Sequence, residues 1–570
     1  MLLQIDNLSK AYRVDDRDVP ALKDVSFTVR PGEVLGIVGR SGGGKSTLLK
    51  VLRGMERFDS GRIAMDDLII APDADDETIR KQNALTAIHL QRDFALWTES
   101  ALKNVVRRIY SRTTGFEVLP IPENPEYDQI YEEAMYYLRL VGLEKKARHL
   151  ATILSGGEKQ RLIIARQLAK KPKLLLLDEP ATMACPATKQ EVLDAIKNVN
   201  KELKLTTVLV SHLPEVHRYL ANRLIWLEKG EIIADGRTDE VLKEFLSGIG
   251  GMEPLASRVN PEPLIKVRGV FKRNYLFGQG EVLKIENLNF DVNEGEITSL
   301  IGNSGGGKTT ILKIMQGVRL PDEGAVLFRH EGKWVDMLVY SPDRMNVRRT
   351  LGIMYQEFAL YPGESIIEHI AYQLGVKGHD VIDHARVMAE ELGISDRVLD
   401  VLYNLTDMSE EDAKAVLESL GLTRDIFKEL FPRFPATEAR SFAEPIFELL
   451  SLDPQVLWKL PDQLSGGERV RAALAILLAA RPKILILDEP FGDIDPITLR
   501  EVSNAIKKIN SRLGTTVILV SHHLNFVKEV SHRAILIEKG AIVAEGDPFE
   551  VCDTFLARCD VPYLKPETAI

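Results

Sequence analysis

Short apolar runs alternate along the chain with longer stretches in which apolar residues recur every three or four positions. The runs within 174–180 and 206–212 have the form of strands buried on both faces, and 189–203 has helical spacing. Residues 2–8 and 21–29 alternate apolar and polar positions, as an antiparallel sheet with one solvated face does. The pattern predicts an α/β fold with a mainly parallel sheet core, an antiparallel β subdomain and a helical subdomain.

The same plan occurs twice. Matching residues are 265 positions apart at Gln91 and Gln356 but 310 apart at Ser155 and Ser465, so the second half carries about 45 additional residues between these motifs. We predict a first domain at 1–246, a linker at 247–263, a second domain at 264–548 with an enlarged helical insert at about 357–460, and a C-terminal tail at 549–570.

Each half contains a glycine-rich loop between a predicted strand and a predicted helix. In both loops two glycines are separated by four residues and followed by Lys and by Ser or Thr, the phosphate-loop pattern. The candidate residues are Gly39, Ser41, Gly42, Gly43, Gly44, Lys45, Ser46 and Thr47 in the first loop and Gly302, Ser304, Gly305, Gly306, Gly307, Lys308, Thr309 and Thr310 in the second.

Such loops bind the phosphates of a nucleotide through backbone N–H groups, a helix N-terminus and a lysine. We expect Lys45 and Lys308 to reach the β- and γ-phosphates of ATP, and the hydroxyls of Ser46 and Thr309 to bind Mg²⁺. Two matches in the correct strand–loop–helix setting make a mere glycine-rich turn a poor explanation.

Composition excludes several other classes of protein. The net charge of −10 argues against general binding of polyanions such as nucleic acids, although it leaves a local basic face open. No apolar run reaches the roughly 18 residues of a membrane span. Three cysteines without a Cys-x-x-Cys pair argue against a zinc ribbon or iron–sulfur cluster held by this chain alone. Without a signal-peptide pattern, a cytoplasmic location and no direct membrane insertion are expected.

Further motifs repeat in the same order. Leu-Ser-Gly-Gly-Glu occurs at 154–158 and 464–468, about 20 residues before an apolar strand that ends in Asp-Glu-Pro, and a histidine follows the next strand. These motifs and the phosphate loops resemble those of ABC-type ATPase domains, and the resemblance covers nearly the whole chain. It implies an ATPase that uses ATP and Mg²⁺.

The resemblance also implies roles for single residues. Asp178 and Asp488 would hold Mg²⁺, together with the glutamines Gln91 and Gln356, which sense Mg²⁺ and the γ-phosphate. Glu179 and Glu489 would be the general bases, and His212 and His522 would contact the γ-phosphate. Tyr12 would stack on adenine. Phe271 is the expected counterpart in the second half, with Tyr275 as an alternative.

In this family the Leu-Ser-Gly-Gly-Glu motif of one half completes the site of the other. Ser465, Gly466 and Gly467 would therefore cap the nucleotide bound at Lys45, and Ser155, Gly156 and Gly157 the nucleotide bound at Lys308. One departure concerns the loop after Asp-Glu-Pro: the second half keeps an aspartate, whereas the first has Cys185 in that place. We expect both sites to hydrolyse ATP, with coupling at the second site in question.

The stretch Asp-Glu-Pro-Ala-Thr-Met-Ala-Cys-Pro, the duplication and the enlarged insert resemble one subfamily. This is the ATP-binding component (component A-two) of the methyl-coenzyme M reductase activation system of methanogenic archaea. The resemblance implies methyl-coenzyme M reductase and its activation proteins as partners. Three alternatives stay open: the duplicated ATPase subunit of a sugar-type importer, an ABC-F-like translation factor, and a non-catalytic ATP-gated scaffold.

Overall fold

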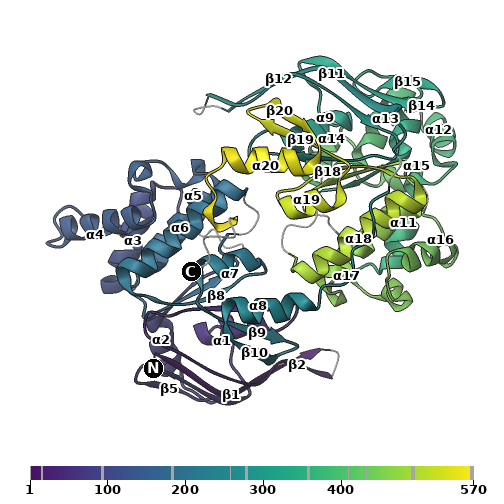
Figure 1. Cartoon of the computed structure of the whole chain (residues 1–570). Coiled ribbons are helices and arrows are strands. Elements are labelled where there is room, and N and C mark those ends of the chain that lie inside the picture. Colours follow the sequence, from purple (N-terminus) through teal and green to yellow (C-terminus); the bar gives the residue numbers. More distant parts are fainter. Residues whose placement is uncertain are drawn as a thin grey trace. The chain divides into compact units, whose positions relative to one another are not determined.

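The computed structural model describes residues 2–14, 17–90, 96–181, 185–256, 259–276, 280–355, 360–408, 410–431, 433–489 and 494–564. The chain forms two compact units (Figure 1). The first comprises Met1–Ile249, Asp493–Ile497 and Cys559–Ile570, and the second comprises Gly250–Gly492 and Thr498–Arg558.

The first unit contains a six-stranded sheet in the order β10-β9-β3-β8-β7-β6 and a four-stranded sheet in the order β2-β1-β4-β5. Strands β6, β7, β8, β3 and β9 pair in parallel, whereas β10 and the four-stranded sheet pair antiparallel. The strands are β1 Leu3–Val14, β2 Arg17–Val29, β3 Val34–Val38, β4 Ser60–Met65, β5 Leu68–Ile70, β6 Thr86–His89, β7 Leu174–Asp178, β8 Thr206–Val210, β9 Arg223–Glu228 and β10 Glu231–Arg237.

Helices of the first unit connect these strands. They are α1 Lys45–Arg53, α2 Asp76–Leu85, α3 Ala101–Thr114, α4 Tyr127–Leu140, α5 Gly156–Leu168, α6 Pro186–Leu203, α7 Pro214–Leu220 and α8 Thr238–Ser247. All residues of β7 and β8 are buried, as their uninterrupted apolar runs predict. Leu3 of β1, Leu35 of β3 and Leu48 of α1 belong to one hydrophobic core, so the phosphate loop is anchored on a rigid layer.

The second unit repeats this plan, with sheet orders β16-β17-β18-β13-β19-β20 and β12-β11-β14-β15. Its strands are β11 Pro263–Leu276, β12 Gly280–Asn293, β13 Ile297–Ile301, β14 Glu323–His330, β15 Lys333–Asp336, β16 Leu351–Met354, β17 Ile484–Asp488, β18 Thr516–Val520, β19 Arg533–Glu538 and β20 Ala541–Gly546. The predicted tandem α/β architecture, with parallel and antiparallel sheets and helices in each half, is confirmed.

Twelve helices belong to the second half of the described chain. They are α9 Lys308–Met315, α10 Arg344–Arg349, α11 Ile366–Lys377, α12 Val381–Glu391, α13 Asp396–Leu405, α14 Glu410–Leu420, α15 Ile426–Leu430, α16 Ala436–Leu449, α17 Gly466–Ala479, α18 Pro496–Leu513, α19 Leu524–Val530 and α20 Pro548–Arg558. Helices α11 to α16 occupy the region where the sequence predicts the insert.

The insert has a hydrophobic core of its own, to which Leu399, Leu402 and Phe431 belong. Beside this core lies a buried ion pair, in which Arg348 Nη1 is 3.2 Å from Asp400 Oδ1 and both side chains are 0% exposed. Burial lowers the pKa of Arg348 to about 10, and the Asp400 carboxylate opposes that shift. Because a buried charge is costly without its partner, this pair fixes how α13 packs on α10.

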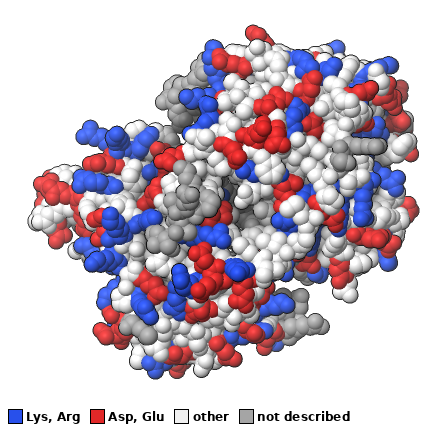
Figure 2. Space-filling view, viewed as in Figure 1, with Lys and Arg blue, Asp and Glu red and all other residues white. Residues whose placement is uncertain are grey.

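Within the described ranges, no helix is both long and apolar enough to cross a membrane. Basic and acidic side chains are interspersed on the face shown in Figure 2.

Candidate ATP sites

Each phosphate loop connects a central strand to a helix: β3 to α1 in the first unit and β13 to α9 in the second. Gly44 and Gly307, which precede the helices, have φ angles of 98° and 93°, in the left-handed region that glycine adopts without strain. A Cβ atom on Gly44 would also lie 2.3 Å from the Ala21 carbonyl oxygen. Both the backbone conformation and the available space therefore require glycine at this position.

The two predicted lysines are buried and lie over their own loops. Lys45 Nζ donates hydrogen bonds to the carbonyl oxygens of Gly39 and Arg40 at 2.9 and 2.8 Å. Lys308 Nζ makes the matching pair of contacts in the second loop, at 3.0 and 2.9 Å. Burial lowers the pKa of Lys45, and the nearby Glu179 carboxylate opposes that shift. Each ammonium group is thus positioned where a loop of this kind binds phosphate oxygens.

A carboxylate and a hydroxyl meet at the end of one central strand in each unit. Thr309 Oγ1 donates to Asp488 Oδ1 at 3.2 Å, and Ser46 hydrogen-bonds Asp178. Burial raises the pKa of Asp178 and, to about 6, that of Asp488. Among the described residues no group of three or more His, Cys, Asp or Glu side chains forms a metal cage. One carboxylate with one hydroxyl fits Mg²⁺, which keeps several waters and binds substrate phosphates.

The predicted general bases have an uncommon backbone conformation. Glu179 and Glu489 have φ angles of 50° and 48°, which cost free energy in a residue other than glycine. Nε2 of His212 lies 3.4 Å from Glu179 Oε1, and Nε2 of His522 lies 2.7 Å from Glu489 Oε1. Burial lowers the pKa of His212 to about 3, so its imidazole is neutral at neutral pH. In both units the structure therefore brings the predicted glutamate and histidine together.

One contact was not anticipated by the sequence motifs. Ser211 Oγ donates to Glu179 Oε2 at 3.2 Å, so the carboxylate is oriented by a hydroxyl as well as by the histidine beside it. The signal was present in the sequence, because Ser-His follows the buried strand in both halves, at 211–212 and at 521–522.

The Leu-Ser-Gly-Gly-Glu motifs lie at the beginnings of α5 and α17, where Ser155 and Ser465 are exposed. Ser155 is the N-cap of α5, where its hydroxyl accepts from the Glu158 N–H at 3.3 Å and the Glu158 carboxylate accepts from the Ser155 N–H at 2.8 Å. Ser465 caps α17 with the same reciprocal bonds to Glu468. The first-turn N–H groups of each helix have no intrahelical acceptor, so each motif presents donors suited to an anion.

The predicted adenine-binding aromatics occupy different positions of matching strands. Lys10, two residues before Tyr12, pairs with Asp59, and Lys272 makes the matching pair with Asp322. This register equates Tyr12 with position 274, whereas Phe271 is one residue before Lys272. Stacking on adenine stays a prediction for both aromatics. The predicted glutamines, Gln91 and Gln356, lie outside the described residues.

The loops that follow Asp-Glu-Pro differ between the halves. Asp495, which belongs to the first unit, accepts a hydrogen bond from the Ser41 N–H at 3.4 Å, and it raises the pKa of Lys45 against the effect of burial. Cys185 is buried at the start of α6, with Sγ 3.3 Å from Thr188 Oγ1. A cysteine thus stands in the first half where the second half has an aspartate.

The sequence matches the family model described as ABC transporter over residues 22–182 and 285–492. An uncharacterised ABC transporter ATP-binding protein of Methanocaldococcus jannaschii is 46% identical over 572 residues, which cover 99% of each chain. A second such protein of the same organism is 33% identical over 586 residues, covering 97% of this chain and 96% of the relative.

The fold is also found among solved structures. A chain in the structure of ribosome-bound archaeal Pelota and ABCE1 aligns with a TM-score of 0.58 at 20% identity, covering 97% of this chain and 80% of that one. This likeness concerns the tandem fold alone. The family match in both halves and the full-length relatives establish that the chain belongs to the ABC transporter family, as a tandem of two ABC ATPase domains that bind and hydrolyse ATP.

Proposed function

We propose that the chain is the ATP-binding component of a system that reductively activates methyl-coenzyme M reductase. ATP binding and hydrolysis at two composite sites would drive closing and opening of the two halves, and this motion would be coupled to the reductase and its activation proteins. One observation carries the catalytic part of the proposal: both units hold a loop lysine, a strand-end aspartate and a glutamate–histidine pair.

The choice of partner has separate support. The stretch at 178–186 and the helical insert resemble the reductase-activation subfamily, and the 46% identical relative comes from a methanogen. The names of these relatives refer to ABC transporters, so the duplicated ATPase subunit of an importer is the alternative that a test of the partner must exclude.

Specific residues would perform each part of ATP hydrolysis. Ser46 with Asp178, and Thr309 with Asp488, would hold Mg²⁺, which neutralises charge on the phosphates when it is bound. Glu179 and Glu489 would accept a proton from the attacking water. Ser465 and Gly467 would complete the site at Lys45, and Ser155 and Gly157 the site at Lys308.

We propose a first domain at 1–246, a linker at 247–263, a second domain at 264–548 and a C-terminal tail at 549–570. Part of the proposed linker is bound within the second unit. Asn504 Nδ2 donates to the Gly251 carbonyl at 2.8 Å, and Lys507 Nζ donates to the Glu253 carbonyl at 3.0 Å. These hydrogen bonds connect the linker to α18. A movement of α18 would therefore also move the linker.

We expect the Lys308→Ala variant to bind one nucleotide fewer per chain than the wild type. The substitution removes the ammonium group that would face the phosphates of the second site, and it leaves Lys45 unchanged. Equilibrium dialysis with ATP and Mg²⁺ measures the stoichiometry, in a background where Glu179 and Glu489 are both glutamine so that ATP persists. Exposed Lys414, which pairs with Glu418, gives a matched Lys→Ala control. An unchanged stoichiometry would contradict the assignment of Lys308.

Reconstitution tests the proposed coupling. The purified wild-type chain, combined anaerobically with inactive reductase, its other activation proteins and a reductant, should yield reductase activity only with ATP. The Glu179→Gln, Glu489→Gln double variant should yield none. If a wild-type chain that hydrolyses ATP gave no activation, the coupling would be wrong although the ATPase assignment stood. Affinity purification of the double variant from its host should recover the reductase, whereas recovery of a permease would favour the importer.

A further inference from the structure

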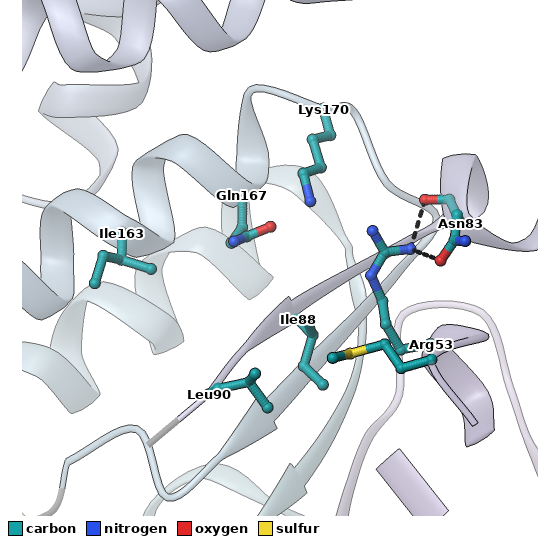
Figure 3. Close-up of a pocket in the computed structure, with 8 residues that line it drawn as sticks. Arg53, Asn83, Ile88, Leu90, Ile163, Gln167 and Lys170 are labelled. Carbon is teal, nitrogen blue, oxygen red and sulfur yellow. Dashed lines mark hydrogen bonds between the residues drawn. The ribbon is translucent and has the colours of Figure 1, made fainter. Parts of the chain in front are cut away.

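The first unit contains a cavity of about 490 Å³ between the end of α1, strand β6 and helix α5. The side chains of Arg53 at the end of α1, Gln167 of α5 and Lys170 in the turn after α5 extend toward it (Figure 3). Arg53 Nη1 donates to the Asn83 carbonyl at 2.8 Å and to Thr86 Oγ1 at 3.0 Å, which fixes the guanidinium beside the cavity. Nη1 also donates to Asn83 Oδ1, so all three contacts use one end of the guanidinium and leave Nε and Nη2 for a ligand.

The charges at the cavity are not balanced locally. Among the residues that the structure describes, neither Arg53 nor Lys170 has a carboxylate within salt-bridge distance. The Gln167 Oε1 atom is also buried, and it has no hydrogen-bond partner among the described residues. Two partly buried cations that face one space repel each other, and an anion between them would relieve that repulsion.

The remaining wall is apolar. Met55, Ile88, Leu90 and Ile163 also line the cavity, and Ile163 lies on the same helix as Gln167. Pockets of this size with apolar walls and a few placed polar groups are typical of small-molecule sites. A ligand that fits would therefore carry an apolar body as well as a negative charge.

The duplication supplies an internal comparison. At the positions that match Arg53, Gln167 and Lys170, the second half has Gln316, Leu477 and Ala480. There Tyr355, the counterpart of Leu90, donates its hydroxyl to Gln316 Oε1 at 2.8 Å. Because the second unit keeps its ATP motifs without these cations, the charged cavity is not part of what ATP hydrolysis requires.

We propose that this cavity binds a small amphiphilic oxyanion, a carboxylate or phosphate ester on a short apolar body. Arg53 and Lys170 would bind the oxyanion, Gln167 would bond a neighbouring polar atom, and Met55, Ile88 and Ile163 would contact the apolar body. The site lies in the first unit only and does not depend on the identity of the protein partner.

The proposal predicts a pH dependence. Burial and, to a smaller extent, the neighbouring cations Arg108, Arg53 and Arg166 lower the pKa of Lys170 to about 7, against the opposing effect of Glu117. Lys170 is therefore charged below that pH and neutral above it. Because a bound anion favours the charged form, its affinity should fall as the pH rises from 6 to 8.5.

The test uses hexanoate and hexyl phosphate as anionic probes and hexanol as their neutral analogue. The Arg53→Gln, Lys170→Ala double variant installs the residues of the second half, so it should fold and keep its basal ATP turnover. By titration calorimetry, loss of the charged contacts should weaken binding of hexanoate by at least about tenfold. Hexyl phosphate is titrated into the same two proteins. Because wild type and double variant have identical phosphate loops, a difference in its affinity reports on the cavity, and comparison with hexanoate shows whether a phosphate is preferred to a carboxylate.

A matched control removes one surface charge elsewhere. Lys173→Ala, at a lysine that is 51% exposed and pairs with Asp66, should leave the affinity for hexanoate unchanged. Equal binding by wild type and double variant would overturn the proposal, as would failure of both anions to bind. Hexanol binding as tightly as hexanoate would also overturn it. If neither probe binds but the double variant loses a protein partner, the cations serve that partner instead.

Discussion

Replacing Glu179 and Glu489 together by glutamine is expected to lower ATP turnover by about 10²- to 10⁴-fold, the usual contribution of a general base. Glutamine keeps the size of the side chain, but it replaces one acceptor oxygen by an NH2 donor and cannot take a proton from water. The backbone at both positions is held in the left-handed region, at φ 50° and 48°. Strain of this kind at both glutamates is typical of residues held for a function.

Measuring phosphate release with saturating ATP and Mg²⁺ checks this expectation, and retained nucleotide binding shows that the variant is folded. The single variants add information, because equal, additive losses would mean independent sites, whereas near-complete loss from either would mean coupled ones. Glu191→Gln is a matched control, since Glu191 is 57% exposed and pairs with Arg161. Wild-type turnover in the double variant would refute the assignment of both bases.

The second large effect concerns stability. Asp400→Asn should destabilise the insert by about 3–5 kcal/mol, the usual cost of leaving one partner of a buried ion pair uncompensated. Arg348 is fully buried, and its guanidinium also lies within hydrogen-bond reach of the Asp400 carbonyl oxygen, at 3.3 Å. Arg344 donates to the same carboxylate, with Nε 3.1 Å from Oδ1. Two guanidinium groups would therefore lose their counter-charge at once.

Urea unfolding followed by circular dichroism measures this loss, and limited proteolysis shows whether α12 to α15 unfold before the rest. Asp425→Asn provides the control, because Asp425 is 74% exposed and pairs with Lys428 on the surface. A solvent-exposed ion pair of this kind contributes little to the free energy of unfolding. If the Asp400→Asn and Asp425→Asn variants unfolded at equal urea midpoints, the buried ion pair would not hold the insert together.

Local patterns were enough to predict the central strands and the phosphate loops. The runs that became β7, β8, β17 and β18 are apolar without interruption, and only a strand buried on both faces suits such a run. Glycine at 44 and 307 was equally informative, since each adopts a positive φ before a helix. The pairing of glutamate with histidine followed from motif order, because parallel strands end at one edge of a sheet.

Other features depend on contacts between distant segments. Arg348 and Asp400 are 52 residues apart, and nothing in the periodicity of their helices marks them as partners. The register that separates Phe271 from the position of Tyr12 depends on where Lys272 meets Asp322, which alternation alone does not fix.

The amino-acid sequence alone therefore determined the strands, phosphate loops and following helices of the two ATP sites, because strand burial and loop conformation depend on the types of neighbouring residues. The charged cavity could be recognised only in the packed molecule. Arg53 and Lys170 are far apart in the sequence and resemble ordinary surface cations until the end of α1 and the turn after α5 place them beside one space. Charge balance there depends on distances across the fold, which the order of residues along a strand or helix does not specify.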